Sequence, residues 1–146
     1  MYLVDANVLL YAVFTNFDQH KIAANWLNNQ LNLENNKLAI PWESYIAFIR
    51  ISCNPRLFSK SLSIKEAWKQ VEEWQSLSTV WTPVPTDNHS SIMSKMVKLC
   101  SLPSGIIHDA HLAALAKSYG LSIASFDKDF SRFEKEVGFF DLSQNL

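Results

Sequence analysis

The chain has 146 residues, which fits one domain with a sizeable core, and we expect residues 1–146 to form that single domain. Hydrophobic residues make up 48% and charged residues 18%, as in ordinary globular proteins. A net charge of −1 argues against a general polyanion binder, and only three glycines argue against a Gly-rich phosphate loop. No apolar run is long enough for a signal peptide or a membrane span, so we expect a cytoplasmic protein without membrane contact.

Strand-like and helix-like patterns alternate along the chain. The apolar run at 1–5 is too short for a buried helix and predicts a strand. Asp18 is a candidate cap for the second helix, while Pro41 stops the second strand and suits the first turn of the third helix. In chain order we expect strands at 1–5, 37–42, 79–85, 121–125 and 137–142, helices at 6–14, 18–31, 41–54, 63–77, 86–100 and 106–120, and a turn at 126–133.

Two helix ends carry clear sequence signals. Ser63 and Glu66 have the spacing of a capping box at the start of the fourth helix, and Gly120 is the expected C-cap of the sixth. Two helices separate each strand from the next over the first four strands. This order predicts an α/β domain with a mostly parallel sheet and helices on both faces.

Four acidic residues fall at strand ends or helix starts. Asp5 ends the first strand, and Asp127 follows the fourth strand by two residues. Glu43 lies in the first turn of the third helix, and Asp109 lies near the start of the sixth. Because ligands bind at the carboxyl ends of parallel strands, we expect the four carboxylates to meet on one rim of the sheet.

Asp109 shares a helix side with apolar residues that must pack inward, namely Leu112, Ala113 and Ala116. A carboxylate on that side needs a partner, and no Lys or Arg occupies the helical positions beside it. A metal ion is the simplest partner. An all-carboxylate site favours Mg²⁺ or Mn²⁺, which prefer oxygen ligands, over Zn²⁺, which prefers His and Cys.

Each acid also has an ordinary structural interpretation. Asp5 can cap the helix that follows it, and Asp127 can be a turn residue. Glu43 and Asp109 can complement the dipoles of their helices. These alternatives stay open for each residue alone, whereas the four acids together favour a metal site.

Three stretches of the chain resemble the PIN-domain family and, within it, the VapC-type toxins. They are "LVDANVLLYA" with Asp5, "IPWESYIAFIRISCNPRLF" with Glu43, and "HDAHLAALAKSYGLSIASFDKDFSRF" with Asp109 and Asp127. The resemblance implies a three-layer α/β/α sandwich and a Mg²⁺- or Mn²⁺-dependent endoribonuclease. It also implies a homodimer and a cognate antitoxin. Two departures from the family pattern are the missing Gly-Asn pair in "PSGIIHD" and Ser125, where Thr is common.

The resemblance also implies roles for the residues. Asp5 and Asp109, helped by Glu43 and Asp127, would be the catalytic metal ligands for hydrolysis of an RNA phosphodiester. Asn7 and Ser125 are candidate substrate-binding residues that could hold the scissile phosphate or a water of the metal site. Arg50 is a third substrate-binding candidate, for an RNA phosphate, or else has a solvent-facing or salt-bridging role. Asp129 is either an extra metal ligand or a loop acid.

Other features point to weaker alternatives. His108 and His111 have H-x-x-H spacing but no suitable third zinc ligand nearby, while His20 and His89 are expected to be lone and exposed. A phosphotransfer domain would need further acids beside Asp5, which "DAN" lacks. A non-catalytic PIN-like module that binds RNA or protein is the main alternative function. The aromatic candidates for a partner surface are Phe58, Trp68 and Trp74.

Overall fold

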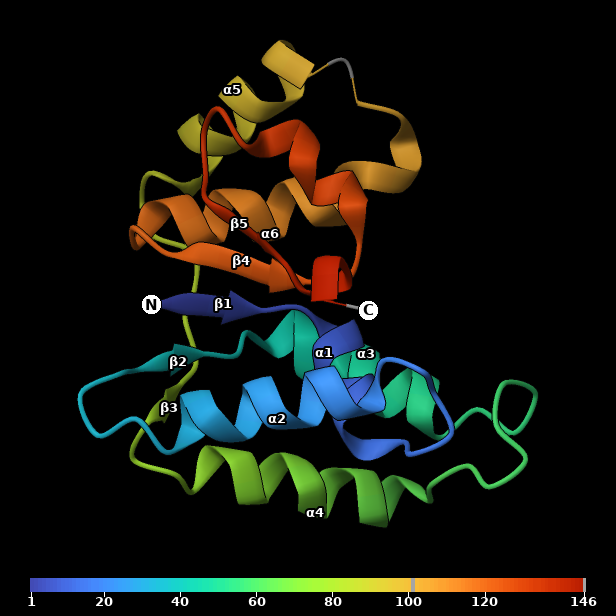
Figure 1. Ribbon diagram of the computed structural model, residues 1–146. Helices are drawn as coiled ribbons and strands as arrows, with labels where there is room; N and C mark the ends of the chain where they lie inside the picture. The colour runs from blue at the N-terminus through green and yellow to red at the C-terminus, as the bar shows by residue number, and fades with distance from the viewer. Residues whose placement is uncertain (101, 146) are drawn as a thin grey trace.

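A five-stranded parallel sheet lies at the centre of the structure, a computed structural model that describes residues 1–100 and 102–145 (Figure 1). The strand order is β3-β2-β1-β4-β5, and every pairing between described residues is parallel. The strands are β1 (Tyr2–Val4), β2 (Leu38–Ala39), β3 (Val80–Trp81), β4 (Ser122–Ser125) and β5 (Phe139–Asp141). The predicted α/β sandwich is therefore confirmed, although β2 and β3 are shorter than expected.

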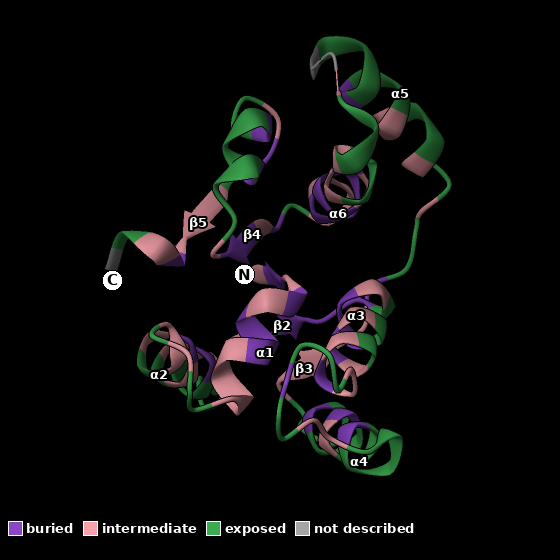
Figure 2. Ribbon diagram, turned by 90° about the vertical axis from the view of Figure 1, so that its right-hand side faces the viewer, coloured by how far each residue is buried: buried purple, intermediate pink, exposed green. Residues whose placement is uncertain are grey.

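Helices cover both faces of the sheet. One core cluster packs Leu3 and Ile123 against α5 and α6, and a second packs Val4 and Ala124 against α1 to α4. Neighbouring residues of a strand therefore point to opposite faces, as a pleated strand requires. Buried positions gather on the central strands and along α6 (Figure 2). The helices are α1 (Ala6–Val13), α2 (His20–Leu31), α3 (Trp42–Ser52), α4 (Ile64–Gln75), α5 (His89–Cys100) and α6 (Ile107–Ser118).

The register of the central strands places chemistry-bearing residues side by side. Val4 of β1 pairs with Ala124 of β4, and the Asp5 N–H donates to the Ala124 carbonyl at 3.1 Å. Asp5 and Ser125 therefore leave the sheet next to each other, at its carboxyl edge. This is the edge at which the sequence predicted the acids to meet.

Helix ends confirm most of the sequence signals. Ser63 and Glu66 form the capping box of α4. Gly120 follows α6 with a φ of 65°, and the Leu121 N–H returns to the Ala116 carbonyl at 2.9 Å, which closes the helix in a Schellman motif.

Other local expectations were wrong. Asp18 does not cap α2, because the residue before that helix is Gln19, which has helical backbone angles and no capping side chain. Pro41 is the N-cap of α3 and so lies just before its first turn. The expected turn at 126–133 holds a 3₁₀ helix, η2, and two other 3₁₀ helices occur among the described residues. The three are η1 (Ser104–Ile106), η2 (Lys128–Phe133) and η3 (Leu142–Asn145). No helix in the described part of the chain has the length and apolar character needed to cross a bilayer.

Candidate active site

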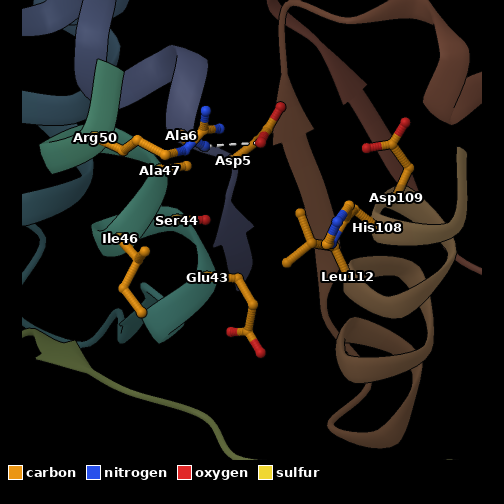
Figure 3. Close-up of a pocket in the computed structure, with 10 residues that line it drawn as sticks. All are labelled: Asp5, Ala6, Glu43, Ser44, Ile46, Ala47, Arg50, His108, Asp109 and Leu112. Carbon is orange, nitrogen blue, oxygen red and sulfur yellow. Dashed lines mark hydrogen bonds between the residues drawn. The ribbon is translucent and has the colours of Figure 1, made fainter. Parts of the chain in front are cut away.

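A pocket of about 500 Å³ opens between α3 and α6, beside the end of β1 (Figure 3). It brings together four of the predicted site residues, Asp5, Glu43, Arg50 and Asp109. The other residues that line it are Ala6, Ser44, Ile46, Ala47, His108 and Leu112. The remaining predicted residues, Asn7, Ser125 and Asp127, are not part of its wall and are linked to Asp5 through hydrogen bonds of Ser125.

Asp5 follows β1, which ends at Val4, and caps α1. Its Oδ1 accepts the Ala6 N–H at 2.7 Å, and its Oδ2 accepts the Ser125 hydroxyl at 2.7 Å. Burial raises the pKa of the Asp5 carboxyl, the two hydrogen bonds oppose that rise, and repulsion from Asp127 adds to it. The capping role and a role in the pocket are therefore compatible, because they belong to the same fixed carboxylate.

Ser125 is fully buried, and its hydroxyl joins three residues. It donates to Asp5 and accepts from the Asn7 side-chain amide at 2.9 Å and from the Asp127 N–H at 2.9 Å. Asn7 in turn accepts the Phe126 N–H through its Oδ1 at 3.2 Å. One donor and two acceptor positions are all that a hydroxyl offers, so Ser125 has no hydrogen-bonding capacity left for another molecule.

Asp109 lies in the first turn of α6 and is half-buried. Its burial and the negative charges of Asp5, Asp127 and Asp129 raise its pKa to about 6, against a smaller opposing effect of Arg132. The neighbours on its side of the helix are buried, as the spacing predicted: Leu112, Ala113 and Ala116. The three other acids therefore act on Asp109 electrostatically, although long stretches of chain separate it from Asp5.

Glu43 reaches the pocket from the first turn of α3. The next residue, Ser44, is buried and donates its hydroxyl to the Val4 carbonyl at 2.7 Å, which fixes the start of α3 against the end of β1. The Glu43 Oε1 accepts a hydrogen bond from His111 Nε2 at 2.6 Å, and this bond is the main cause that lowers the pKa of Glu43. In Figure 3 the carboxylates of Asp5 and Asp109 lie at one end of the pocket and that of Glu43 lies at the other.

Two histidines join this site in a way that the sequence did not indicate. His89 is partly buried and lies 2.9 Å from His111 through the atoms Nε2 and Nδ1, so the expectation of a lone, exposed His89 was wrong. His20 also has a partner, because its Nδ1 lies 2.9 Å from the Tyr11 carbonyl. No spacing signal joins Glu43, His89 and His111, because they come from three different helices.

The remaining candidate residues are Arg50, Asp129 and the three aromatic residues, and they differ in exposure and in their partners. Arg50 is exposed at the pocket wall, where a guanidinium can meet a phosphate. The Asp129 carboxylate lies 3.5 Å from the guanidinium of Arg132, three residues further along the chain, and forms an ion pair with it. Among the aromatic candidates for a partner surface, Trp74 and Phe58 are buried, which contradicts the expectation, and Trp68 is exposed.

Carboxylate oxygens are the donors that the pocket offers to a divalent cation such as Mg²⁺ or Mn²⁺. In residues 1–100 and 102–145, no three side chains of His, Cys, Asp or Glu form a group that could hold a metal ion. Mg²⁺ needs no such cage, because it keeps several waters and is bound through one or two carboxylates and the substrate phosphate. The crowded carboxylates of Asp5 and Asp109 fit that requirement, because a divalent cation would relieve the repulsion that raises the pKa of Asp109.

Comparisons with known proteins identify relatives of the chain. Residues 2–136 match the family model described as PIN domain. The chain is 37% identical to the ribonuclease VapC37 of Mycobacterium tuberculosis (strain ATCC 25618 / H37Rv) over 134 aligned residues. The aligned residues make up 92% of each chain.

Solved structures with a similar fold include VapBC2 from Rickettsia felis bound to a promoter DNA fragment, with a TM-score of 0.69 and 15% identity over 96% of this chain and 97% of that chain. A toxin–antitoxin complex from Klebsiella pneumoniae matches with a TM-score of 0.63 and 15% identity, over 97% of this chain and 98% of that chain. At these identities the structural matches show the fold alone.

Proposed function

The chain belongs to the PIN-domain family, and from that premise we propose that it is a metal-dependent endoribonuclease, the VapC-type toxin of a toxin–antitoxin pair. Residues 1–146 act as one nuclease domain that hydrolyses RNA phosphodiester bonds. The observation that carries the proposal is the pair of carboxylates, Asp5 and Asp109, at one end of the pocket, with the negative charges of Asp5 and Asp127 acting on Asp109.

Mg²⁺ or Mn²⁺ is the proposed cofactor. Asp5 and Asp109 would hold it directly, and Glu43 and Asp127 would act on it through water. When bound, the cation supplies Lewis acidity for the attack of water on the phosphodiester. Asp109 must be ionised to bind it, so the raised pKa of Asp109 makes cation binding weaker in acid.

The other residues have roles set by where they lie. Arg50, exposed at the wall of the pocket, orients a phosphate of the RNA. Ser125 and Asn7, which the resemblance assigned to the scissile phosphate or a water of the metal site, act through their hydrogen bonds to the protein. Their hydrogen bonds fix Asp5 and the backbone of Asp127 in one arrangement, which limits how much the site must reorganise during the reaction.

We propose two protein partners. The structure from Klebsiella pneumoniae is that of a toxin–antitoxin complex, and a cognate antitoxin that inhibits this nuclease is the corresponding partner. The second is another copy of the chain, in a homodimer. The cytoplasm is the compartment in which such an enzyme meets both RNA and a newly made antitoxin.

The test is cleavage of a mixed RNA pool by the wild type and by Asp5→Asn, with Asp18→Asn as a matched control outside the pocket. We expect Asp5→Asn to keep the circular dichroism spectrum and to lose more than about 100-fold in cleavage rate, beyond the effect typical of residues that only support a site. Asp18→Asn should cleave like the wild type. A folded wild type that binds RNA but never cleaves it would favour the non-catalytic module instead.

A further inference from the structure

A chain of hydrogen bonds runs from the pocket into the protein through Glu43, His111 and His89. His111 Nε2 lies 2.6 Å from Glu43 Oε1, and His111 Nδ1 lies 2.9 Å from His89 Nε2. The two imidazole rings meet edge to face, with centroids 4.8 Å apart. The three residues come from α3, α6 and α5, so the chain connects helices that pack on opposite faces of the sheet.

The hydrogen bonds have only one consistent direction when both rings are neutral. An ionised Glu43 can only accept, so His111 must carry its proton on Nε2. Its Nδ1 is then an acceptor, and His89 must donate from Nε2. In the part of the chain that the structure describes, His89 Nδ1 is buried and has no hydrogen-bond partner. Burial is the main cause that lowers the pKa of His89.

Glu43 needs such a support because its side chain is long and its surroundings are open. The side chain of Glu43 is 38% exposed, against 24% for that of His111. Ser44 fixes the backbone beside it, but a free glutamate side chain would still sample several rotamers, and fixing it costs conformational entropy. The bond to His111 selects one of those rotamers, and the bond to His89 selects the orientation of the His111 ring.

We propose that His111 and His89 are positioning residues, which hold the Glu43 carboxylate at its own end of the pocket so that it acts through water, and not as a direct metal ligand. This inference rests on the proposed nuclease function. It concerns two residues that do not touch the reacting atoms. Their contribution is therefore to the rate of the bound complex more than to the binding of metal or RNA.

The variants His111→Leu, His111→Gln and His89→Leu test the proposal, with His20→Gln as a control histidine on α2. We expect His111→Leu to lower kcat by about 10- to 100-fold, the usual effect of losing a residue that supports a catalytic group. KM for RNA and the calorimetric affinity for Mn²⁺ should stay close to the wild type. His111→Gln, which keeps an N–H donor, should recover part of kcat, and His89→Leu should lose less than His111→Leu.

A second readout needs neither metal nor RNA. Nitrogen NMR of the histidine side chains in the intact protein should show His111 with a proton on Nε2, and Glu43→Gln should shift the His111 signals. His111 protonated on Nδ1 alone would overturn the hydrogen-bond chain. An active wild type whose His111→Leu variant keeps its kcat would overturn the positioning role alone, whereas a wild type without cleavage would overturn the proposed function and the positioning role together.

Discussion

At the residue scale, the proposed metal site combines a carboxylate that is held by hydrogen bonds with a second carboxylate that lies near other acids. Asp5 has one oxygen on the Ala6 N–H and the other on the Ser125 hydroxyl, so its side chain has little freedom. Asp109 is half-buried, and its burial together with the nearby acids raises its pKa to about 6. Fixed and crowded negative charge is the feature that a divalent cation relieves.

The raised pKa of Asp109 predicts how stability depends on pH in the metal-free protein. A carboxyl whose pKa is higher in the folded than in the unfolded protein contributes stability below about pH 4, and that contribution is lost as the pH rises through about 6. Asp109→Asn removes the ionisable carboxyl, so the variant does not lose this stability as the pH rises. We expect the variant to be more stable than the wild type by about 1 kcal/mol at about pH 7, reduced from the full shift because the group is half exposed.

The measurement is thermal melting in EDTA for the wild type and for Asp109→Asn. The gain should appear as a Tm about 2–4 °C higher at about pH 7 and should vanish at about pH 4. A Tm difference that is the same at both pH values would mean that the Asp109 charge is not destabilised by its neighbours.

Ser125 gives a second prediction at this scale. Ser125→Ala leaves the Asn7 amide and the Asp127 N–H without their acceptor, and we expect it to cost about 1–3 kcal/mol of stability. Cleavage should fall by about 10- to 100-fold because Asp5 loses a support. Ser118→Ala is the control, since its hydroxyl only donates to the Ala114 carbonyl within α6. Chemical denaturation and RNA cleavage measure both effects, and a Ser125→Ala protein with unchanged cleavage would exclude the supporting role.

At the element scale, parallel strand register explains which parts of the site the sequence could predict. Asp5 and Asp127 follow strands whose carboxyl ends must share one edge, and the apolar side of α6 turns Asp109 inward. The partners of Glu43 could not be predicted, because His111 and His89 come from helices on the other face, and helix packing decides their contact. The role of Ser125 needed the same tertiary information.

The end of α6 provides a stability prediction at this scale. Gly120 has a φ of 65°, and a Cβ placed on it would meet no atom within 4 Å. A substitution there therefore destabilises the protein through backbone strain and not through a steric clash. We expect Gly120→Ala to lose about 1 kcal/mol, while Gly120→Asn loses less because Asn tolerates this conformation. Denaturant unfolding measures the difference. Equal stability of the two variants would argue against the strain, and RNA cleavage should be unchanged in both.

At the scale of the whole molecule, the pocket lies where the two faces of the sheet meet. α3 belongs to one core cluster and α6 to the other, and both line the pocket beside the end of β1 (Figure 3). The site therefore forms only when both clusters are packed against the sheet. The layered architecture was predictable from the alternation of strands and helices. The sequence did not predict which apolar side chains of the helices stay exposed.

The homodimer is the prediction for the assembled molecule. Four large apolar side chains of α3 and α4 are exposed, and the rings of Trp42 and Trp68 stack at 6.2 Å. Homodimer interfaces are more apolar than ordinary surface, so we expect this face to lie in the interface. The exposed residues are Trp42, Ile46, Ile64 and Trp68.

Sedimentation velocity at micromolar concentration should show a dimer for the wild type and a monomer for Ile64→Glu. Leu99→Glu is the matched control, because Leu99 is equally exposed on α5, at the other face of the sheet. A dimer that persists in the Ile64→Glu variant but is lost in the Leu99→Glu variant would contradict the prediction, because the interface would then lie on the α5 side of the sheet.

We predict that RNA hydrolysis depends on a divalent cation that the Asp5 and Asp109 carboxylates bind. The most direct measurement is cleavage of a mixed RNA pool by the wild type in EDTA, Mg²⁺, Mn²⁺ or Ca²⁺, with the Tm recorded in each. We expect Mg²⁺ and Mn²⁺ to raise the Tm with concentration and to support cleavage, and Ca²⁺ to raise the Tm but to support cleavage poorly, because its coordination is looser. Cleavage should stop in EDTA and return with Mn²⁺, and undiminished cleavage in excess EDTA would contradict the claim.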